Sequence, residues 1–127
     1  MTFARIDSGK KGEGLAVDFL KKQGFRIIAR NYKTRLGEID IIGRDKGCIS
    51  FIEVRSLNSR IFEAPEYTID RRKQGQISKA ALSYIKRYGL EDKDSRFDVV
   101  CVEGVDSASP NIRLIKNAFD LEPHYRY

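Results

Sequence analysis

The sequence has few of the residues that crosslink small proteins. Its 127 residues include two cysteines, one histidine, three prolines and no tryptophan. Two cysteines are too few for a disulfide framework or for a zinc site built from cysteine alone. Cys48 and Cys101 lie in apolar, strand-like runs, where cysteine usually behaves as a small buried hydrophobic residue. A chain of this length buries roughly two-thirds of its unfolded surface, so a hydrophobic core can stabilise it without crosslinks.

Long apolar runs are also missing from the chain. No segment approaches the ~18 residues of a membrane span, and the N-terminus lacks the hydrophobic stretch of a signal peptide. Hydrophobic residues still make up 41% of the sequence, which excludes a disordered tail. We therefore expect a cytoplasmic protein with no membrane partner. We expect a single domain over residues 1–127, with a core over about residues 9–119 and a short C-terminal tail.

Several familiar catalytic patterns are absent as well. The phosphate-binding patterns GxxxxGK[ST] and GxGxxG do not occur, which argues against the common nucleotide-binding enzymes. Ser78 and Ser83 have no partnering histidine, so serine-nucleophile chemistry is unsupported. The single histidine, His124, lies in the C-terminal tail, where we expect an exposed side chain.

Basic residues outnumber acidic residues, 24 to 18, for a formal net charge of +6. Residues 1–35 carry a net +6 and residues 66–90 a net +4, whereas residues 36–65 and 91–127 carry −1 and −3. Basic surfaces attract polyanions because binding releases the counterions condensed on phosphate, so nucleic acid is the first partner to consider. A basic surface that is merely solvated is the alternative.

Hydrophobic periodicity predicts a helix followed by three strands. Apolar residues at helical spacing predict a helix over about residues 10–23, with Gly24 as its stop. Strand-like runs follow over residues 25–32, 37–42 and 48–55, and the last two are joined by a sequence typical of a hairpin turn at residues 45–47. Three successive strands of this kind predict an antiparallel meander.

The second half of the chain predicts a loop, a helix and two further strands. Residues 56–67 have weak periodicity and contain a proline, which favours a loop. Asp70 is a candidate N-cap for a helix that ends near Gly89; its predicted buried stripe is Ile77, Ala81, Tyr84, Ile85 and Tyr88. Strands are expected over residues 97–103 and 111–115. The elements together predict one α/β domain.

The first turn of this second helix is unusually basic. Arg71, Arg72 and Lys73 lie where the helix dipole disfavours positive charge. An anionic partner near this turn would explain their placement, and so would a local structural exception.

Acidic residues interrupt two otherwise apolar strands. Asp40 lies between two isoleucines, and Glu53 lies between Ile52 and Val54. Because strand side chains alternate, Glu53 and Arg55 should share a face, and Asp40 should point away from its flanking isoleucines. If Asp40 and Glu53 face each other across the hairpin, a divalent metal would relieve their repulsion and suit phosphodiester hydrolysis. The alternative is a salt bridge between Glu53 and Arg55 on an edge strand, with Asp40 half exposed.

Ordered sequence blocks resemble a known family over nearly the whole chain, from about residue 9 to residue 119. The blocks are GEGLA at residues 12–16, NYKTRLGEIDII at residues 31–42, FIEVR at residues 51–55, Lys73, the alanine pair at residues 80–81 and RFDVV at residues 96–100. They resemble the YraN-type family (UPF0102), which is similar to restriction-endonuclease-like nucleases of the PD-(D/E)xK type and to Holliday-junction resolvases. The resemblance implies an α/β restriction-endonuclease-like core, with a central mixed five-stranded sheet flanked by helices and the hairpin forming the catalytic edge.

The resemblance also implies roles for three carboxylates. Asp40 takes the place of the motif aspartate and Glu53 that of the (D/E), so both would bind Mg²⁺ or Mn²⁺. Glu13 matches the helix glutamate that assists the metal in related nucleases. For Glu13, an ordinary first-turn carboxylate favoured by the helix dipole is the alternative.

Arg55 departs from the family pattern, which expects lysine at this position. Arginine stays protonated and cannot act as a general base, although its planar fork can still stabilise a phosphate. Lys73 is the nearest lysine by pattern that could substitute. We otherwise assign Lys73 and Gln76 to a solvated face or to phosphate contact, and the expected nucleic-acid contacts are Arg35, Arg71, Arg72, Lys73 and Gln76.

Three hypotheses follow. The first is a metal-dependent endonuclease that acts on structured or branched DNA, with DNA favoured over RNA and a homodimer left open. The second is a nucleic-acid-binding module of the same fold that has lost catalysis through Arg55. The third is a structural or assembly protein that binds neither DNA nor metal.

Overall fold

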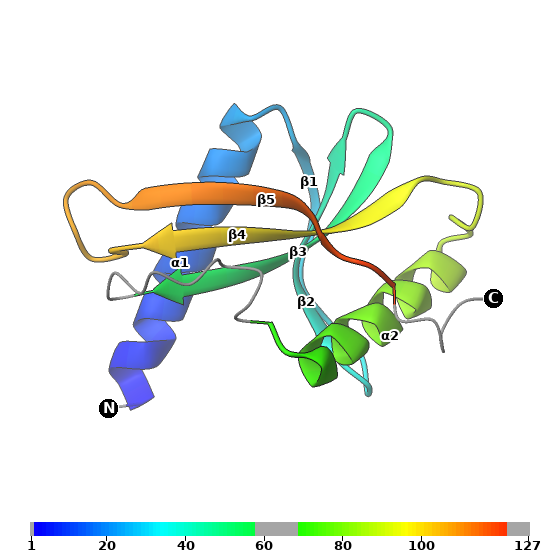
Figure 1. The fold of residues 1–127 in the computed structure, drawn as a ribbon, viewed down its shortest axis with the longest axis horizontal. Helices are drawn as coiled ribbons and strands as arrows, with labels where there is room; N and C mark the ends of the chain where they lie inside the picture. Colours follow the sequence, from blue (N-terminus) through cyan, green and yellow to red (C-terminus); the bar gives the residue numbers. More distant parts are fainter. Residues whose placement is uncertain (1, 58–68, 122–127) are drawn as a thin grey trace.

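The computed structural model describes residues 2–57 and 69–121, with side chains over residues 9–56 and 69–121. This part of the chain forms two helices and five strands, whose arrangement can be followed in Figure 1. In chain order they are α1 (Thr2–Lys22), β1 (Arg26–Lys33), β2 (Glu38–Asp45), β3 (Cys48–Leu57), α2 (Arg71–Arg87), β4 (Ser95–Glu103) and β5 (Asn111–Phe119).

The five strands form one mixed sheet in the order β1-β2-β3-β4-β5. Strands β1, β2 and β3 pair antiparallel, which confirms the predicted meander. Strands β3 and β4 pair parallel, and β4 and β5 pair antiparallel. Because parallel neighbours need a crossover connection, the segment that contains α2 carries the chain from β3 to β4. This topology makes β3 the central strand.

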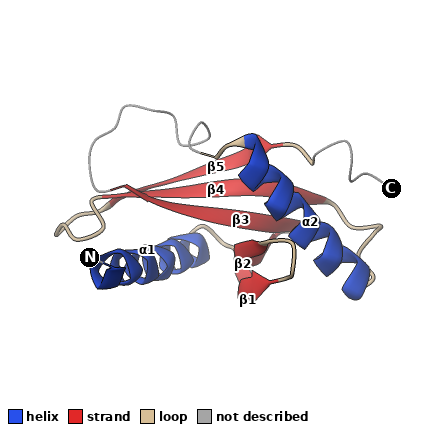
Figure 2. Cartoon of the chain, turned by 90° about the horizontal axis from the view of Figure 1, so that it is seen from below, coloured by secondary structure: helices blue, strands red, loops and turns tan. Residues whose placement is uncertain are grey.

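The two helices cover opposite faces of the sheet (Figure 2). Neighbouring residues of the central strands point to opposite sides, as the strand period of two requires. Phe51 and Val99 pack with α2, whereas Ile52 and Val100 pack with α1. The result is a three-layer α/β fold consistent with a restriction-endonuclease-like core, as the sequence predicts.

Helix α2 begins and ends near the predicted residues. The Asp70 side chain caps its start by accepting a hydrogen bond from the backbone N–H of Lys73 at 2.8 Å. Gly89 follows the C-cap with a φ of 62°, a conformation that glycine adopts without a steric cost. The predicted buried stripe is correct except at Tyr88, whose side chain is 52% exposed. Tyr88 is the C-cap residue, so the helix has already ended where the pattern predicts a further buried turn.

Helix α1 begins eight residues earlier than predicted, at Thr2. Gly12, which lies inside both the predicted and the observed helix, has a packing role. A side chain there would meet Ser56 of β3, so glycine allows the helix backbone to approach the sheet closely. Because Glu13 lies in the middle of this longer helix, the first-turn explanation for Glu13 is wrong.

Other boundaries extend the predicted elements. Strand β3 continues to Leu57 and β5 to Phe119, so part of the predicted loop and part of the ambiguous tail are strand. The rest of the predicted loop and His124 lie outside the described residues.

Both cysteines are free; Cys101 is buried and Cys48 is half-buried. Neither described helix is both long and apolar enough to cross a membrane.

Candidate active site

A fork between β2 and β3 positions the two strand carboxylates. The two strands pair from Ile41 opposite Ile52 to the hairpin turn, but not beyond Ile41 toward the start of β2. There β2 stays paired with β1, while β3 stays paired with β4. At the fork, Oδ2 of Asp40 accepts a hydrogen bond from the backbone N–H of Val54 at 2.8 Å. The Asp40 side chain therefore replaces a missing backbone partner and is held against β3.

The fork also breaks the regular alternation of β2. Ile39 packs in the core under α2, whereas Ile41 packs in the core under α1. The prediction that Asp40 points away from both isoleucines on a common face is therefore wrong. The side chains of β2 change the face to which they point where β2 leaves β3, because β3 no longer holds β2 in the plane of the sheet.

Glu53 lies on β3 beside this fork and is only 5% exposed. Burial, the nearby charge of Asp40 and a hydrogen bond between the two carboxyl groups raise the pKa of Glu53 to about 8. Lys73 and Arg55 oppose this effect. Since a buried carboxylate beside another anion is costly, this pair has a strong requirement for a proton or a cation.

Lys73 supplies one positive charge at this position. Its Nζ lies 3.8 Å from Oε2 of Glu53. Lys73 is in the first turn of α2, so the loop and helix that follow β3 return a lysine to the carboxylate that β3 provides. Arg55 lowers the pKa of Glu53 through its charge. The alternative of an edge-strand salt bridge is wrong in one respect, because β3 is the central strand.

Glu13 approaches the same site from α1. Burial raises the pKa of Glu13, and the charge of Asp40 raises it further, whereas Arg30 and a hydrogen bond from Asn31 lower it. The Arg30 guanidinium lies 3.9 Å from Oε1 of Glu13. Asn31 has a φ of 53°, the left-handed conformation that asparagine tolerates better than most residues. Arg30 and Asn31 thus hold the third carboxylate near the pair, a role that the sequence pattern did not identify.

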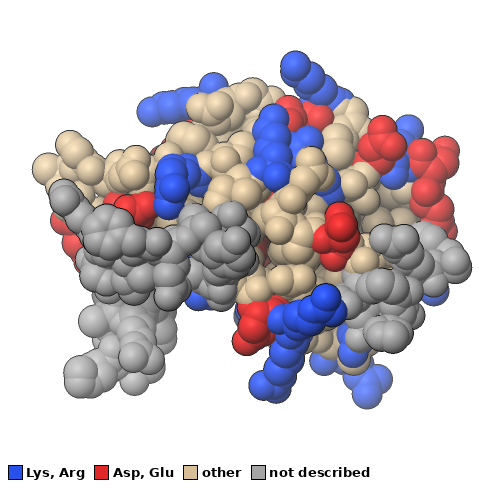
Figure 3. All heavy atoms as spheres, viewed as in Figure 1, with Lys and Arg blue, Asp and Glu red and all other residues tan. Residues whose placement is uncertain are grey.

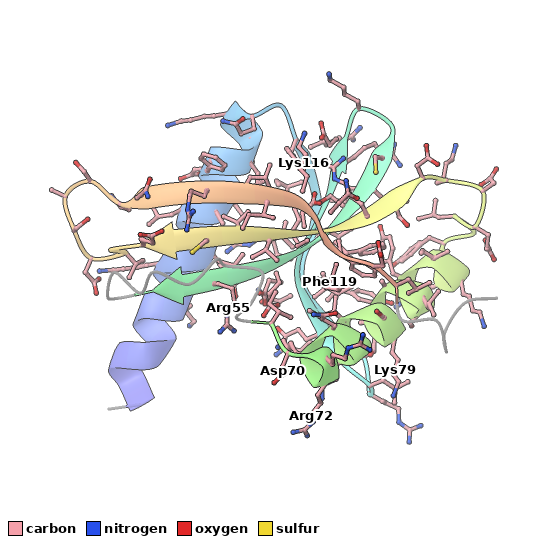
Figure 4. All side chains as sticks on the ribbon, in the orientation of Figure 1. Arg55, Asp70, Arg72, Lys79, Lys116 and Phe119 are labelled. Atoms are coloured by element: carbon pink, nitrogen blue, oxygen red, sulfur yellow. The ribbon has the colours of Figure 1, made fainter. Side chains whose placement is uncertain are left out.

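Of the predicted nucleic-acid contacts, Lys73 lies in the site, and the others lie on the β1–β2 turn and at the start of α2. Arg71 and Arg72 are exposed in the first turn of α2, and Arg72 points away from the sheet in Figure 4. Arg35 is exposed in the turn between β1 and β2. That turn packs against α2, because a side chain at Gly37 would collide with the backbone of Gln76. Figure 3 shows basic side chains projecting from the lower side of the molecule in this view, where α2 begins.

The residues present fit a magnesium ion. Mg²⁺ is usually held by one or two carboxylates, with water and substrate phosphate completing its octahedron. Asp40 and Glu53 provide such a pair, and Asp40 already has one oxygen engaged by the backbone. The residues that the structure describes include no group of three or more His, Cys, Asp or Glu side chains placed to hold a metal. A protein-only cage is therefore not present in this part of the chain, and the pair depends on water or phosphate for its remaining ligands.

A second polar cluster lies at the other end of β3. Asp98 is fully buried and accepts hydrogen bonds from Ser50 at 2.5 Å, from Arg96 at 2.8 Å and from the backbone N–H of Asn117 at 3.0 Å. Arg96 also donates to Asp45 at 2.7 Å. These bonds join β2, β3, β4 and β5 and satisfy the buried charge, so we interpret the cluster as structural.

The fold and the carboxylate pair define a class: a three-layer α/β protein whose mixed sheet is consistent with a restriction-endonuclease-like core. Comparison with known proteins gives the family. Residues 12–102 match UPF0102, described as an uncharacterised protein family, and the chain belongs to it.

Several relatives are similar over most of their length. A UPF0102 protein from Trichlorobacter lovleyi is 46% identical over 114 residues, covering 89% of this chain and 90% of the relative. One from Desulfosudis oleivorans is 45% identical, covering 91% of this chain and 92% of the relative. One from Persephonella marina is 43% identical, covering 90% and 94%. The resemblance predicted from the ordered sequence blocks is confirmed.

Proposed function

We propose that this protein is a Mg²⁺-dependent endonuclease that hydrolyses phosphodiester bonds in structured or branched DNA. The observation that carries the proposal is the pair formed by Asp40 and Glu53 at the fork. Two carboxyl groups are brought together there, one of them almost fully buried. A structural role alone would be served by a neutral or oppositely charged partner, whereas a pair of carboxylates suits a dication.

Asp40 and Glu53 would hold the metal. When bound, Mg²⁺ or Mn²⁺ would polarise the phosphoryl oxygen and lower the pKa of the attacking water. Asp40 is kept in place by the Val54 N–H. Glu13, held by Arg30 and Asn31, would contribute a third carboxylate through water.

Lys73 supplies the positive charge that the related nucleases obtain from a lysine at the position of Arg55. Its ammonium group lies beside Glu53, and the Lys73 side chain is 42% exposed, so it borders both the site and solvent. A cation there would stabilise the additional negative charge that phosphate carries in the transition state. Arg55 would assist by contacting phosphate, because its guanidinium presents a planar pair of donors.

The basic segments support DNA as the substrate. Arg35 lies on the β1–β2 turn, and Arg71, Arg72 and Gln76 lie in the first turns of α2, the helix that carries Lys73. Contacts of this kind to phosphate carry no sequence information, so we expect recognition of DNA shape. Two symmetric cuts need two sites, so the proposal includes a homodimer. It also includes a cytoplasmic location.

A second candidate function rests on Arg55. Arginine cannot act as a general base, so a module of the same fold that binds nucleic acid without cleaving it is the alternative. It predicts salt-dependent binding and no cleavage with any metal.

The test is a cleavage assay with labelled duplex, single strand, flap and four-way junction, titrated with Mg²⁺ and Mn²⁺. We expect metal-dependent cleavage that Asp40→Asn abolishes without lowering the thermal unfolding temperature, because asparagine removes the charge beside Glu53 and can still accept from the Val54 N–H. Asp92→Asn is the matched control, because Asp92 is exposed in the turn after α2. Binding without cleavage would favour the second candidate. Absence of both binding and cleavage at low salt would refute both.

A further inference from the structure

A hollow of about 370 Å³ lies between the C-terminal end of α2 and the sheet edge formed by β1 and β2. It is lined by Arg26 of β1, by Arg44 of β2 and by Tyr84 and Tyr88 of α2 and its cap, with aliphatic side chains between them. None of these lining residues is acidic. The hollow is therefore basic and aromatic.

The two arginines lie directly opposite each other. Arg26 and Arg44 are cross-strand partners in the pairing of β1 with β2, and both are exposed. Like charges in this position destabilise a strand pair. An anion bound between them would turn that repulsion into attraction.

The aromatic part of the hollow presents an open ring. Tyr88 is 52% exposed, and its ring centroid lies 4.7 Å from that of Tyr84, which is buried. Tyr84 in turn contacts Tyr32 edge to face at 5.3 Å, so a fixed aromatic base supports the exposed ring. The guanidinium of Arg87 lies over the Tyr88 ring, 5.4 Å from its centroid. The ring therefore already packs against a planar group, which a base would join or replace.

We propose that this hollow binds an unpaired nucleotide of the nucleic-acid substrate, with its base stacked on Tyr88 and its phosphate between Arg26 and Arg44. Aromatic stacking combined with arginine is how proteins bind single strands without reading their sequence. This inference rests on the proposed function and narrows it to substrates with a single-stranded segment.

The position of the hollow fits a strand that also reaches the carboxylates. Four residues of extended β2 separate Asp40 from Arg44, a distance of about 13 Å. Fifteen residues of α2 and its cap separate Lys73 from Tyr88, a distance of about 22 Å. One strand that runs along the α2 side of the sheet can therefore contact both places.

Binding of a fluorescein-labelled oligothymidylate, measured by anisotropy in EDTA, tests the inference without cleavage. We expect Tyr88→Leu to bind roughly ten-fold more weakly and Tyr88→Phe to bind like the wild type, because phenylalanine keeps the stacking face. Arg26→Gln and Arg44→Gln should each reduce the salt slope of binding by about one. Arg113→Gln, on β5 at the opposite edge of the sheet, is the matched control and should leave the slope unchanged.

Tyrosine fluorescence provides a second readout. Since the chain has no tryptophan, oligothymidylate should quench tyrosine emission in the wild type and quench it less in Tyr88→Leu. Equal affinities for Tyr88→Leu, Tyr88→Phe and the wild type would overturn the inference. It would also be overturned if Tyr88→Leu lost affinity equally for oligothymidylate and for dextran sulfate. Conversion of a dimer to a monomer by Tyr88→Leu, with oligonucleotide binding unchanged, would assign the surface to an interface between copies and would also overturn it.

The outcome is separable from that of the proposed function. The binding assay contains no metal and uses wild-type Asp40 and Glu53. Loss of single-strand binding in Tyr88→Leu together with no cleavage by the wild type would support the hollow and refute the nuclease. Metal-dependent cleavage by the wild type, together with single-strand binding that Tyr88→Leu leaves unchanged, would support the nuclease and refute the hollow.

Discussion

Replacing Glu53 with glutamine should stabilise the metal-free protein while removing its activity. Glu53 is almost fully buried beside Asp40, so its charged form is costly in the folded state. Glutamine has nearly the same shape and no charge, and its amide can donate a hydrogen bond to the Asp40 carboxylate. The predicted gain in stability and loss of metal binding have the same physical origin.

The size of the effect follows from the pKa of Glu53. The folded protein raises this pKa from an ordinary value of 4.5 to about 8. Between these values the folded state binds more protons than the unfolded state, so the free energy of unfolding falls as pH rises. Full ionisation of Glu53 then costs at most about 5 kcal/mol. Glu53→Gln should match the wild type below pH 4.5 and exceed its stability by several kcal/mol above pH 8.

Urea unfolding in EDTA at a series of pH values from 4.5 to 9 measures this difference. Subtracting the profile of Glu53→Gln from that of the wild type removes the contributions of all other titrating groups. Glu91→Gln, exposed in the turn after α2, is the matched control and should follow the wild type. Saturating Mg²⁺ should narrow the difference, because a ligand at 100 times its Kd adds about 2.7 kcal/mol to the wild type alone.

Parallel pH profiles for the wild type and Glu53→Gln in EDTA would refute the reasoning, since they would show that Glu53 is ionised at no cost. A lower stability of Glu53→Gln at pH 9 would refute it more strongly. That result would mean that the Lys73 ion pair outweighs the burial of the charge.

Three further predictions concern the core, a close contact and the site. Asp98→Asn should lower the free energy of unfolding by about 3–5 kcal/mol in urea titrations, because Arg96 then loses a buried ionic partner; equal stability would show that the cluster is dispensable. Gly37→Ala should lower it by about 1–3 kcal/mol, because the added carbon would collide with the backbone of Gln76; an unchanged melting temperature in circular dichroism would contradict this. Arg55→Lys should raise the rate of metal-dependent cleavage, and no change would show that the residue does not take part.

Local sequence patterns were sufficient to predict most of the fold. The five strands, the meander and the capped start of α2 depend on alternation, turn residues and N-cap chemistry, which act between near neighbours. The predicted start of α1 is too late because the prediction rests on apolar residues at helical spacing, which begin at Leu15, whereas the helix begins at Thr2. Tyr88 was assigned to the core because periodicity does not show where a helix stops covering the sheet.

The sequence indicates the residues of the candidate site but not their geometry. Asp40 and Glu53 stand out because each interrupts an apolar run. Their relation depends on the point where β2 leaves β3, and no local pattern encodes that point. The contribution of Arg30 and Asn31 beside Glu13 was missed for a similar reason, since they lie on β1 and meet α1 only after folding.

The sequence by itself determined the element order, the two acidic interruptions and the basic segments, because these follow from residue types and short-range spacing. Only the tertiary structure decided that Lys73 returns to Glu53, that the carboxylate is buried, and that Arg26 and Arg44 face each other beside an exposed tyrosine. These relations join residues far apart along the chain. Strand register and the path of the crossover set them, and both result from burying the two faces of the sheet at once.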